Sequence, residues 1–316
     1  LFKTREQMQS VGYELESNHF VKDNNRWLPL YEAKMIHHFH HRFGDYADLP
    51  NDSASTQLPD VPLERLQSAN YEPLPRYWVS EAEVLKAAPV DNDYFMGFRD
   101  ITNSTNERTV ITAYFPRSGV SNKLPLLQND FPLLQNVMLN SCLNSFACDF
   151  VSRFKIGGTS LNFFIAKQLA VIPPSVFTST PWIGEYILPR ALELIYTSHS
   201  LAPFARDLGY DGPPFIWDEQ RRFYIRCELD ALFFHLYLGS ESDWQGTPPP
   251  SGHLTTPPSG YLATSSTRYS TAHLAHFPIP RHAVEYIMET FPIVKRKDEQ
   301  EFGEYRTKRR ILEIYD

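Results

Sequence analysis

A long apolar stripe marks the middle of the chain. The residues that share it at helical spacing are Leu134, Val137, Met138, Cys142, Ser145 and Asp149. This period predicts one long, mostly buried helix over 131–154. Gly157 and Gly158 follow it, and paired glycines after a helix are typical of a C-terminal cap. The alternative role for these glycines is a phosphate site, because their backbone amides are open to an anion.

The C-terminal part of the chain is predicted to be helical. One apolar stripe contains Leu188, Leu192 and Ile195, and a second contains Phe223, Cys227, Ala231 and Phe234. The second stripe predicts a helix that begins after Asp218 and ends near Leu238. A short helix over 200–208 is expected to end at Gly209. Residues 239–280 are rich in Pro, Gly, Ser and Thr, which predicts a long loop.

Strand patterns are fewer and lie in the first half. β-branched and aromatic residues favour strands over 27–36 and 107–117, and 159–171 is expected to form a strand and a turn. Ser80 and Glu83 have the spacing of a capping box, so a helix is expected from Ser80 to just before Pro89. The remainder of residues 1–75 is expected to be irregular. Together these patterns predict an α+β fold, and the mixed-charge last 25 residues predict a surface helix or extension.

Composition narrows the class of protein. The chain has 316 residues, of which 42% are hydrophobic and 21% are charged, as in ordinary soluble globular proteins. No apolar run reaches the roughly 18 residues of a membrane span, and no signal peptide is recognisable, so we expect a cytoplasmic protein without a membrane partner. Because the chain begins at Leu1, we expect a fragment or a processed chain. Its three cysteines are expected to be buried free thiols.

Charge is distributed unevenly along the sequence. The formal net charge is −7, but residues 95–170 contain seven basic and four acidic side chains. A locally basic module within an acidic chain is compatible with binding to phosphate groups, because only the facing surface matters. The negative net charge therefore does not exclude a nucleic-acid partner.

Histidines suggest a different chemistry. In the segment "MIHHFHHRF" (35–43), His37 and His41 would share a helix face, whereas His38 and His40 would share a strand face. Either pair has spacing suited to zinc. A metal-dependent enzyme is therefore one alternative, although polar or stacking histidines explain the same pattern.

Motifs for catalysis are absent from the sequence. It contains no GxSxG, HExxH, Walker A or GxGxxG motif. The segment "GYDGPPF" (209–215) has Gly212 where an amino-methyltransferase tetrad needs a polar acceptor, so we interpret it as a turn. We therefore assign no catalytic residue and no cofactor to this chain.

Five segments together resemble a known family. They are "LPLYEAKMIHHFHHRFGDY" (28–46), "MGFRDITNSTNERTVITAYFP" (96–116), "LNSCLNSFACDFVSRFKIGGTSLNFFIAKQLAVIPP" (139–174), "DEQRRFYIRCELDALFFHLY" (218–237) and "ETFPIVKRKDEQEFGEYRTKRRILEIYD" (289–316). In order and spacing they resemble the C-terminal target-recognition region of large bacterial adenine-N6 DNA methyltransferases. Such enzymes, including the single-chain type IIG kind, serve restriction–modification and phage defence.

The resemblance implies an organisation and a function. Residues 1–75 would connect to a preceding methylase domain, 76–176 would form the target-recognition core, and 177–316 would form a helical unit with the insertion at 239–280. The chain would select a sequence in double-stranded DNA. The methylase domain of the parent protein would bind S-adenosylmethionine, and a nuclease or helicase is a further possible partner. A protein-interaction or specificity subunit without its own DNA affinity remains the second alternative.

Candidate DNA-binding residues follow from this resemblance and from side-chain chemistry. Phosphate contacts are expected from Lys34, Arg42, Arg153, Lys155, Gly157, Gly158, Thr159 and Lys167. Base-edge contacts are expected from Arg99, Asn103 and Arg108, since arginine can pair with guanine and asparagine with adenine. The alternative for Arg99 and Arg108 is that they form ion pairs with Asp100 and Glu107 and shape the loop.

Overall fold

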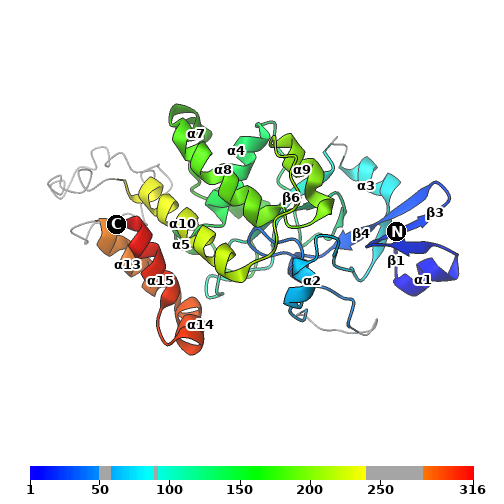
Figure 1. Ribbon diagram of the computed structural model, residues 1–316, viewed down its shortest axis with the longest axis horizontal. Coiled ribbons are helices and arrows are strands. Elements are labelled where there is room, and N and C mark those ends of the chain that lie inside the picture. Colours follow the sequence, from blue (N-terminus) through cyan, green and yellow to red (C-terminus); the bar gives the residue numbers. More distant parts are fainter. Residues whose placement is uncertain (50–57, 89–91, 240–279) are drawn as a thin grey trace. The chain divides into compact units, whose positions relative to one another are not determined.

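The computed structural model describes residues 1–49, 58–88, 92–239 and 280–316, and it shows an α+β protein (Figure 1). The chain forms two compact units, each built from separate stretches. Unit 1 contains 1–101, 111–140 and 188–218, and unit 2 contains 102–110, 141–187 and 219–316. These boundaries do not coincide with those predicted at residues 75 and 176. The predicted loop over 239–280 lies almost wholly outside the described residues.

Unit 1 is built on a six-stranded sheet. Its elements are β1 (Phe2–Lys3), α1 (Arg5–Ser10), β2 (Glu14–Glu16), β3 (His19–Lys22), β4 (Asn25–Tyr31), η1 (Ala33–Met35), α2 (Leu63–Gln67), β5 (Trp78–Ser80), α3 (Glu81–Ala87), β6 (Tyr94–Phe98), β7 (Thr112–Pro116), β8 (Gly119–Val120), η2 (His199–Leu201) and α9 (Ala202–Asp207). The strand order is β1-β5-β4-β3-β2, and β8 pairs in parallel with β4. The expectation of an irregular N-terminal segment was therefore wrong.

Two tight turns build the outer strands of this sheet. Ser17 and Asp23 have φ angles of 55° and 51°, in the left-handed region that short hairpin connections use. They join β2 to β3 and β3 to β4, all antiparallel. Phe20 on β3 packs edge-on against Trp78 on β5, with ring centroids 4.9 Å apart.

A second sheet in unit 1 consists of β6 and β7, which pair antiparallel with Phe95 opposite Phe115. Phe115 also stacks on Tyr31, with ring centroids 5.3 Å apart, and this contact joins both sheets in one core. The predicted strand over 107–117 is confirmed only for Thr112–Pro116. Residues 102–110, between these strands, belong to unit 2.

Unit 2 is helical in its described part. Its elements are α5 (Phe146–Arg153), α6 (Phe163–Ala166), α7 (Pro174–Ser179), α10 (Glu219–Leu238), α13 (Pro280–Glu289), α14 (Pro292–Phe302) and α15 (Arg306–Tyr315), and α4 (Leu133–Leu143) and α8 (Pro181–Ile195) each belong partly to both units. α10 packs against α5 and α15 (Figure 1). The strand expected over 159–171 was wrong, because α6 lies there.

The long helix predicted over 131–154 is two helices. Ser145 interrupts it with an extended backbone, and its hydroxyl accepts a hydrogen bond from the Cys148 amide as the N-cap of α5. α5 ends at Arg153 with Phe154 as its C-cap, and Gly157 and Gly158 do not have left-handed φ angles. They therefore do not form the expected C-terminal cap.

Several other predictions are confirmed. α8 and α10 lie where the apolar stripes predicted helices. α9 lies within the short helix expected over 200–208, and Gly209 follows it with a φ of 82°. α3 begins after Ser80, but no side-chain hydrogen bond caps it. All three cysteines are free and buried. Within the described ranges, no helix is both long enough and apolar enough to cross a membrane.

Candidate nucleic-acid interface

Helix α5 anchors the loop 102–110 through one buried carboxylate. Asp149 is fully buried, and its Oδ2 atom accepts hydrogen bonds from the amides of Thr109 (2.8 Å) and Val110 (3.4 Å). The Arg108 Nε atom donates to the same oxygen at 3.1 Å, and Arg153 Nε donates to Oδ1 at 3.1 Å. Asp149 thus fixes the loop and the end of α5 to each other. Its helical spacing was visible in the sequence, but its role as an anchor was not.

Arg153 connects three parts of unit 2. Its guanidinium donates to the backbone carbonyls of Thr290 (2.8 Å), Asn106 (2.9 Å) and Glu107 (3.2 Å). It also covers the Phe291 ring, 3.9 Å from the centroid. Burial lowers the pKa of this guanidinium, and the neighbouring carboxylate of Asp149 opposes the shift. Arg153 is engaged by the protein and is not presented to a phosphate.

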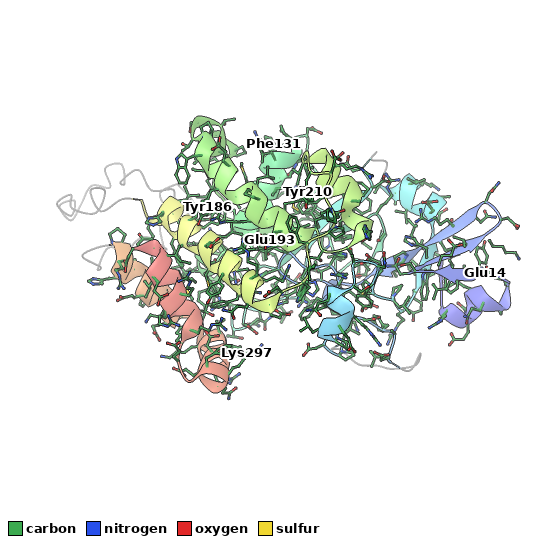
Figure 2. The ribbon with its side chains drawn as sticks, in the orientation of Figure 1. Glu14, Phe131, Tyr186, Glu193, Tyr210 and Lys297 are labelled. Carbon is green, nitrogen blue, oxygen red and sulfur yellow. The ribbon has the colours of Figure 1, made fainter. Side chains whose placement is uncertain are left out.

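Arg108 is equally enclosed. Besides Asp149, it donates to the Asn144 carbonyl at 2.6 Å and lies 4.0 Å from the centroid of the Phe146 ring. The expected ion pair with Glu107 does not form, since Glu107 pairs with Lys297 of α14, whose position Figure 2 marks. The alternative that this arginine shapes the loop therefore fits the geometry, although with Asp149 as its partner.

Asn103 also shapes the loop. Its Oδ1 atom accepts hydrogen bonds from the Thr105 amide (2.9 Å) and hydroxyl (2.8 Å), which closes a turn. The side chain is partly exposed. It is the candidate base-reading residue that keeps access to solvent.

Three candidate residues lie in unit 1. Arg42 is 0% exposed, and its guanidinium donates to four backbone carbonyls, those of Leu66, Ser68, Tyr71 and Thr197. Arg99 donates to the Ile36 carbonyl, and burial lowers its pKa to about 10. Lys34 is partly buried, 3.9 Å from Glu32 and 5.0 Å from the Tyr46 ring centroid. We leave these three residues out of the interface, because their cationic groups face the protein itself.

The remaining candidates lie within residues 155–167 of unit 2. Gly157, Gly158 and Thr159 are exposed, and Lys155 before them is partly buried. A Cβ atom added at either glycine would meet no atom within 4 Å, so the space in front of this turn is open. The Thr159 carbonyl accepts a hydrogen bond from the Thr102 amide at 3.1 Å, which ties the turn to the anchored loop. Lys167 is exposed directly after α6.

The histidine segment forms a turn in place of a helix or strand. His37 and His40 exchange backbone hydrogen bonds around Phe39, whose φ is 55°. The His40 ring lies 4.2 Å from Trp217, and the His37 ring lies 4.7 Å from Phe43. Across the part of the chain that the structure describes, no three His, Cys, Asp or Glu side chains group as metal ligands. These contacts favour stacking histidines over a metal centre.

His41 belongs to a buried polar cluster that the sequence did not indicate. Its Nε2 atom lies 3.1 Å from Ser198 Oγ and 3.6 Å from Glu72 Oε2. Burial raises the pKa of Glu72, but the nearby His41, Ser200 and Ser198 outweigh it and the pKa is lowered. One ring nitrogen faces both the serine and the carboxylate, so the histidine cannot relay a proton between them as in a hydrolytic triad.

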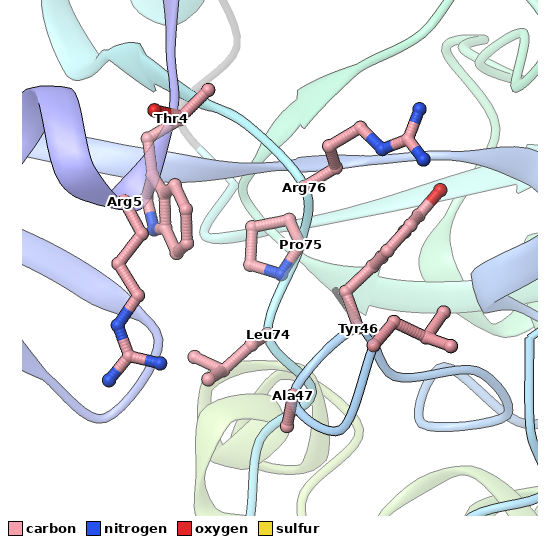
Figure 3. Close-up of a pocket in the computed structure, with 9 residues that line it drawn as sticks. Thr4, Arg5, Tyr46, Ala47, Leu74, Pro75 and Arg76 are labelled. Carbon is pink, nitrogen blue, oxygen red and sulfur yellow. The ribbon is translucent and has the colours of Figure 1, made fainter. Parts of the chain in front are cut away.

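A small pocket lies beside the first sheet of unit 1. Figure 3 shows it between Arg5, Tyr46, Pro75 and Arg76. Trp78 also lines it. Its volume of about 50 Å³ is far below the roughly 300 Å³ or more of common ligand sites. We therefore assign no ligand to it.

No known family, curated protein or solved structure matches this chain.

Proposed function

We propose that the chain is the DNA-recognition module of a site-specific adenine-N6 DNA methyltransferase of a restriction–modification or phage-defence system. The order and spacing of the five similar segments support this function. The structural observation that carries it is the exposed glycine turn at 155–159, attached to the buried helix α5. The module would select the duplex sequence, and a neighbouring methylase domain would flip the adenine.

The turn supplies two kinds of phosphate contact in this proposal. Backbone amides at Gly157, Gly158 and Thr159 donate to phosphate oxygens, and the missing side chains let the DNA backbone approach closely. Lys155 and Lys167 add positive charge on either side in the sequence. Asn103, on the loop tied to this turn, is the remaining candidate for base contacts.

Partners and compartment follow from the same function. The methylase domain would bind S-adenosylmethionine, and double-stranded DNA in the cytoplasm would be the ligand of this chain. A nuclease or helicase would act on the same site.

The first test measures binding of the full chain to duplex DNA as a function of salt. The logarithm of the association constant is expected to fall linearly with the logarithm of the salt concentration, with a slope of about −0.9 per phosphate neutralised. Affinity that stays flat between low and physiological salt would contradict the proposal. Tight capture of a partner subunit without DNA affinity at any salt would favour a specificity or interaction subunit.

Variants locate the interface. Lys155→Gln and Lys167→Gln are each expected to reduce the steepness of the salt dependence by about one unit. Gly157→Ala and Gly158→Ala are each expected to weaken binding about tenfold, because a Cβ atom holds the phosphate away from the amides. Lys86→Gln, an exposed lysine on α3, is the matched control and should change neither quantity. Equal effects of Lys155→Gln, Lys167→Gln and Lys86→Gln on the salt dependence would mean that the interface does not lie at residues 155–167.

A further inference from the structure

An exposed aromatic side chain lies next to the proposed phosphate contacts. Phe164 is 76% exposed, more than any other phenylalanine in the described residues, and Phe163 beside it is about half exposed. Both belong to α6, a single helical turn that follows the glycine turn in the chain. Two adjacent exposed rings make a small apolar patch, and burying it against a partner would be favourable.

The helical turn holds the rings and a cation together. Asn162 caps α6 by accepting a hydrogen bond from the Ile165 amide at 3.0 Å, and the Lys167 amide donates to the Phe163 carbonyl at 3.1 Å. Residues three and four positions apart are neighbours on a helix, so Lys167 lies on the side of Phe164 and Phe163.

Charge identifies the kind of partner. The sequence has no Asp or Glu from residue 150 to residue 184, whereas Lys155 and Lys167 are basic. A surface with exposed rings, lysines and no carboxylate of its own complements an anion that also presents flat apolar faces. Nucleic acid has both properties, in its phosphates and its bases.

We propose that Phe164 stacks on a nucleobase where the bound DNA is locally opened, while Lys167 contacts the adjacent phosphate. The inference rests on the proposed function and adds the way in which DNA is held. Stacking covers the ring and is tolerant of sequence, because every base has a π face. Opening a paired step costs free energy, so DNA that already contains an unpaired base is the preferred ligand.

The test compares two duplexes of the same sequence, one fully paired and one with a single unpaired base. The full chain is expected to bind the second duplex more tightly. Phe164→Ala should weaken binding to it by about tenfold and abolish the preference, whereas Phe164→Trp should retain both. Because the side chain is mostly exposed, these variants are expected to keep the wild-type unfolding midpoint, which is measured in parallel.

Phe131→Ala is the matched control. Phe131 is another exposed phenylalanine, labelled in Figure 2, but it follows Asp130 in the sequence. Its removal should leave both affinities unchanged. Salt-dependent binding to paired DNA with no effect of Phe164→Ala would overturn the stacking role and leave the proposed function intact. Absence of binding to either DNA would overturn both, and binding to anionic lipid vesicles that depends on Phe164 would assign the ring to a membrane surface.

Discussion

Arg108 and Arg153 bind opposite oxygens of one buried carboxylate, each through its Nε atom at 3.1 Å from Asp149. Their guanidinium groups cover Phe146 and Phe291, whose rings meet edge-on with centroids 4.7 Å apart. The two cations lie close together because the carboxylate between them offsets their repulsion. This arrangement holds the loop 102–110 against α5 and against the segment that follows α13.

Removal of that carboxylate should destabilise the protein strongly. Asp149→Ala leaves two largely buried guanidinium groups without their anionic partner and the Thr109 amide without its acceptor. We expect the free energy of unfolding to fall by about 3–5 kcal/mol, as for other broken buried ion pairs. Urea denaturation measures it, with Asp130→Ala as an exposed control expected to change stability by less than about 0.5 kcal/mol. A similar small change for both variants would show that the carboxylate is dispensable.

Arg42 gives a comparable test in unit 1. Arg42→Met retains the apolar part of the side chain but removes the donor to the carbonyls of Leu66, Tyr71 and Thr197. The Ser68 carbonyl, which Arg42 also binds, still accepts a hydrogen bond from the Tyr71 amide. Each unsatisfied buried acceptor costs about 1–3 kcal/mol, so a total loss of at least about 3 kcal/mol is expected in urea denaturation. Arg26→Met removes an exposed arginine 3.6 Å from Glu81 and is the control. Equal stability of the two variants would contradict a structural role for Arg42.

These arginines show where sequence reasoning stops. A guanidinium binds phosphate oxygens and backbone carbonyls through the same donors, so residue type alone does not distinguish the two roles. The carbonyls that Arg42 binds lie 24 to 155 residues away in the sequence. Only the folded chain brings them together. By contrast, the exposed turn at Gly157 and Gly158 was predictable, because glycines and a lysine between two apolar segments favour a surface position.

Some elements of secondary structure could likewise be predicted from the sequence, and others could not. Helix α10 was predicted because its apolar stripe recurs from Phe223 to Phe234. Strands β1 and β2 contain two and three residues, too few for an alternation of apolar and polar positions. The break before α5 was missed because apolar residues continue on both sides of Ser145, although a serine N-cap is a recognisable signal.

Glycine substitutions should separate folding from the proposed DNA contact. Gly303 follows α14 with a φ of 74°, and its amide donates to the Glu299 carbonyl as a C-terminal cap. Gly303→Ala is expected to cost about 1 kcal/mol, since alanine disfavours the left-handed region. Gly157→Ala should cost less than about 0.5 kcal/mol, because its φ is outside that region and the space around it is open. Thermal unfolding of both variants measures the difference, and a larger loss at Gly157 would make that turn a folding element.

Asp230 should make stability depend on pH. Burial raises its pKa to about 6, whereas Arg108 and the Phe146 amide, which donates to Oδ1 at 2.7 Å, act in the opposite direction. The folded state therefore binds this proton more tightly than the unfolded state, whose carboxyl has a pKa near 4. Its contribution to stability is complete below about pH 4 and is lost as the pH rises through 6, a change of about 3 kcal/mol.

Comparison with Asp230→Asn isolates this contribution. The amide oxygen of asparagine still accepts the Phe146 hydrogen bond, but it carries no charge to desolvate. Burial and Arg26 lower the pKa of His19 to about 4, so this histidine changes stability in the opposite direction over this range. It is present in both proteins. The variant is expected to match the wild type near pH 4 and to exceed its stability by about 3 kcal/mol at pH 7.5. Urea denaturation between pH 4 and 7.5 measures the difference in the free energy of unfolding between the two proteins. A difference that does not vary with pH would mean that Asp230 has the same pKa in the folded and unfolded states.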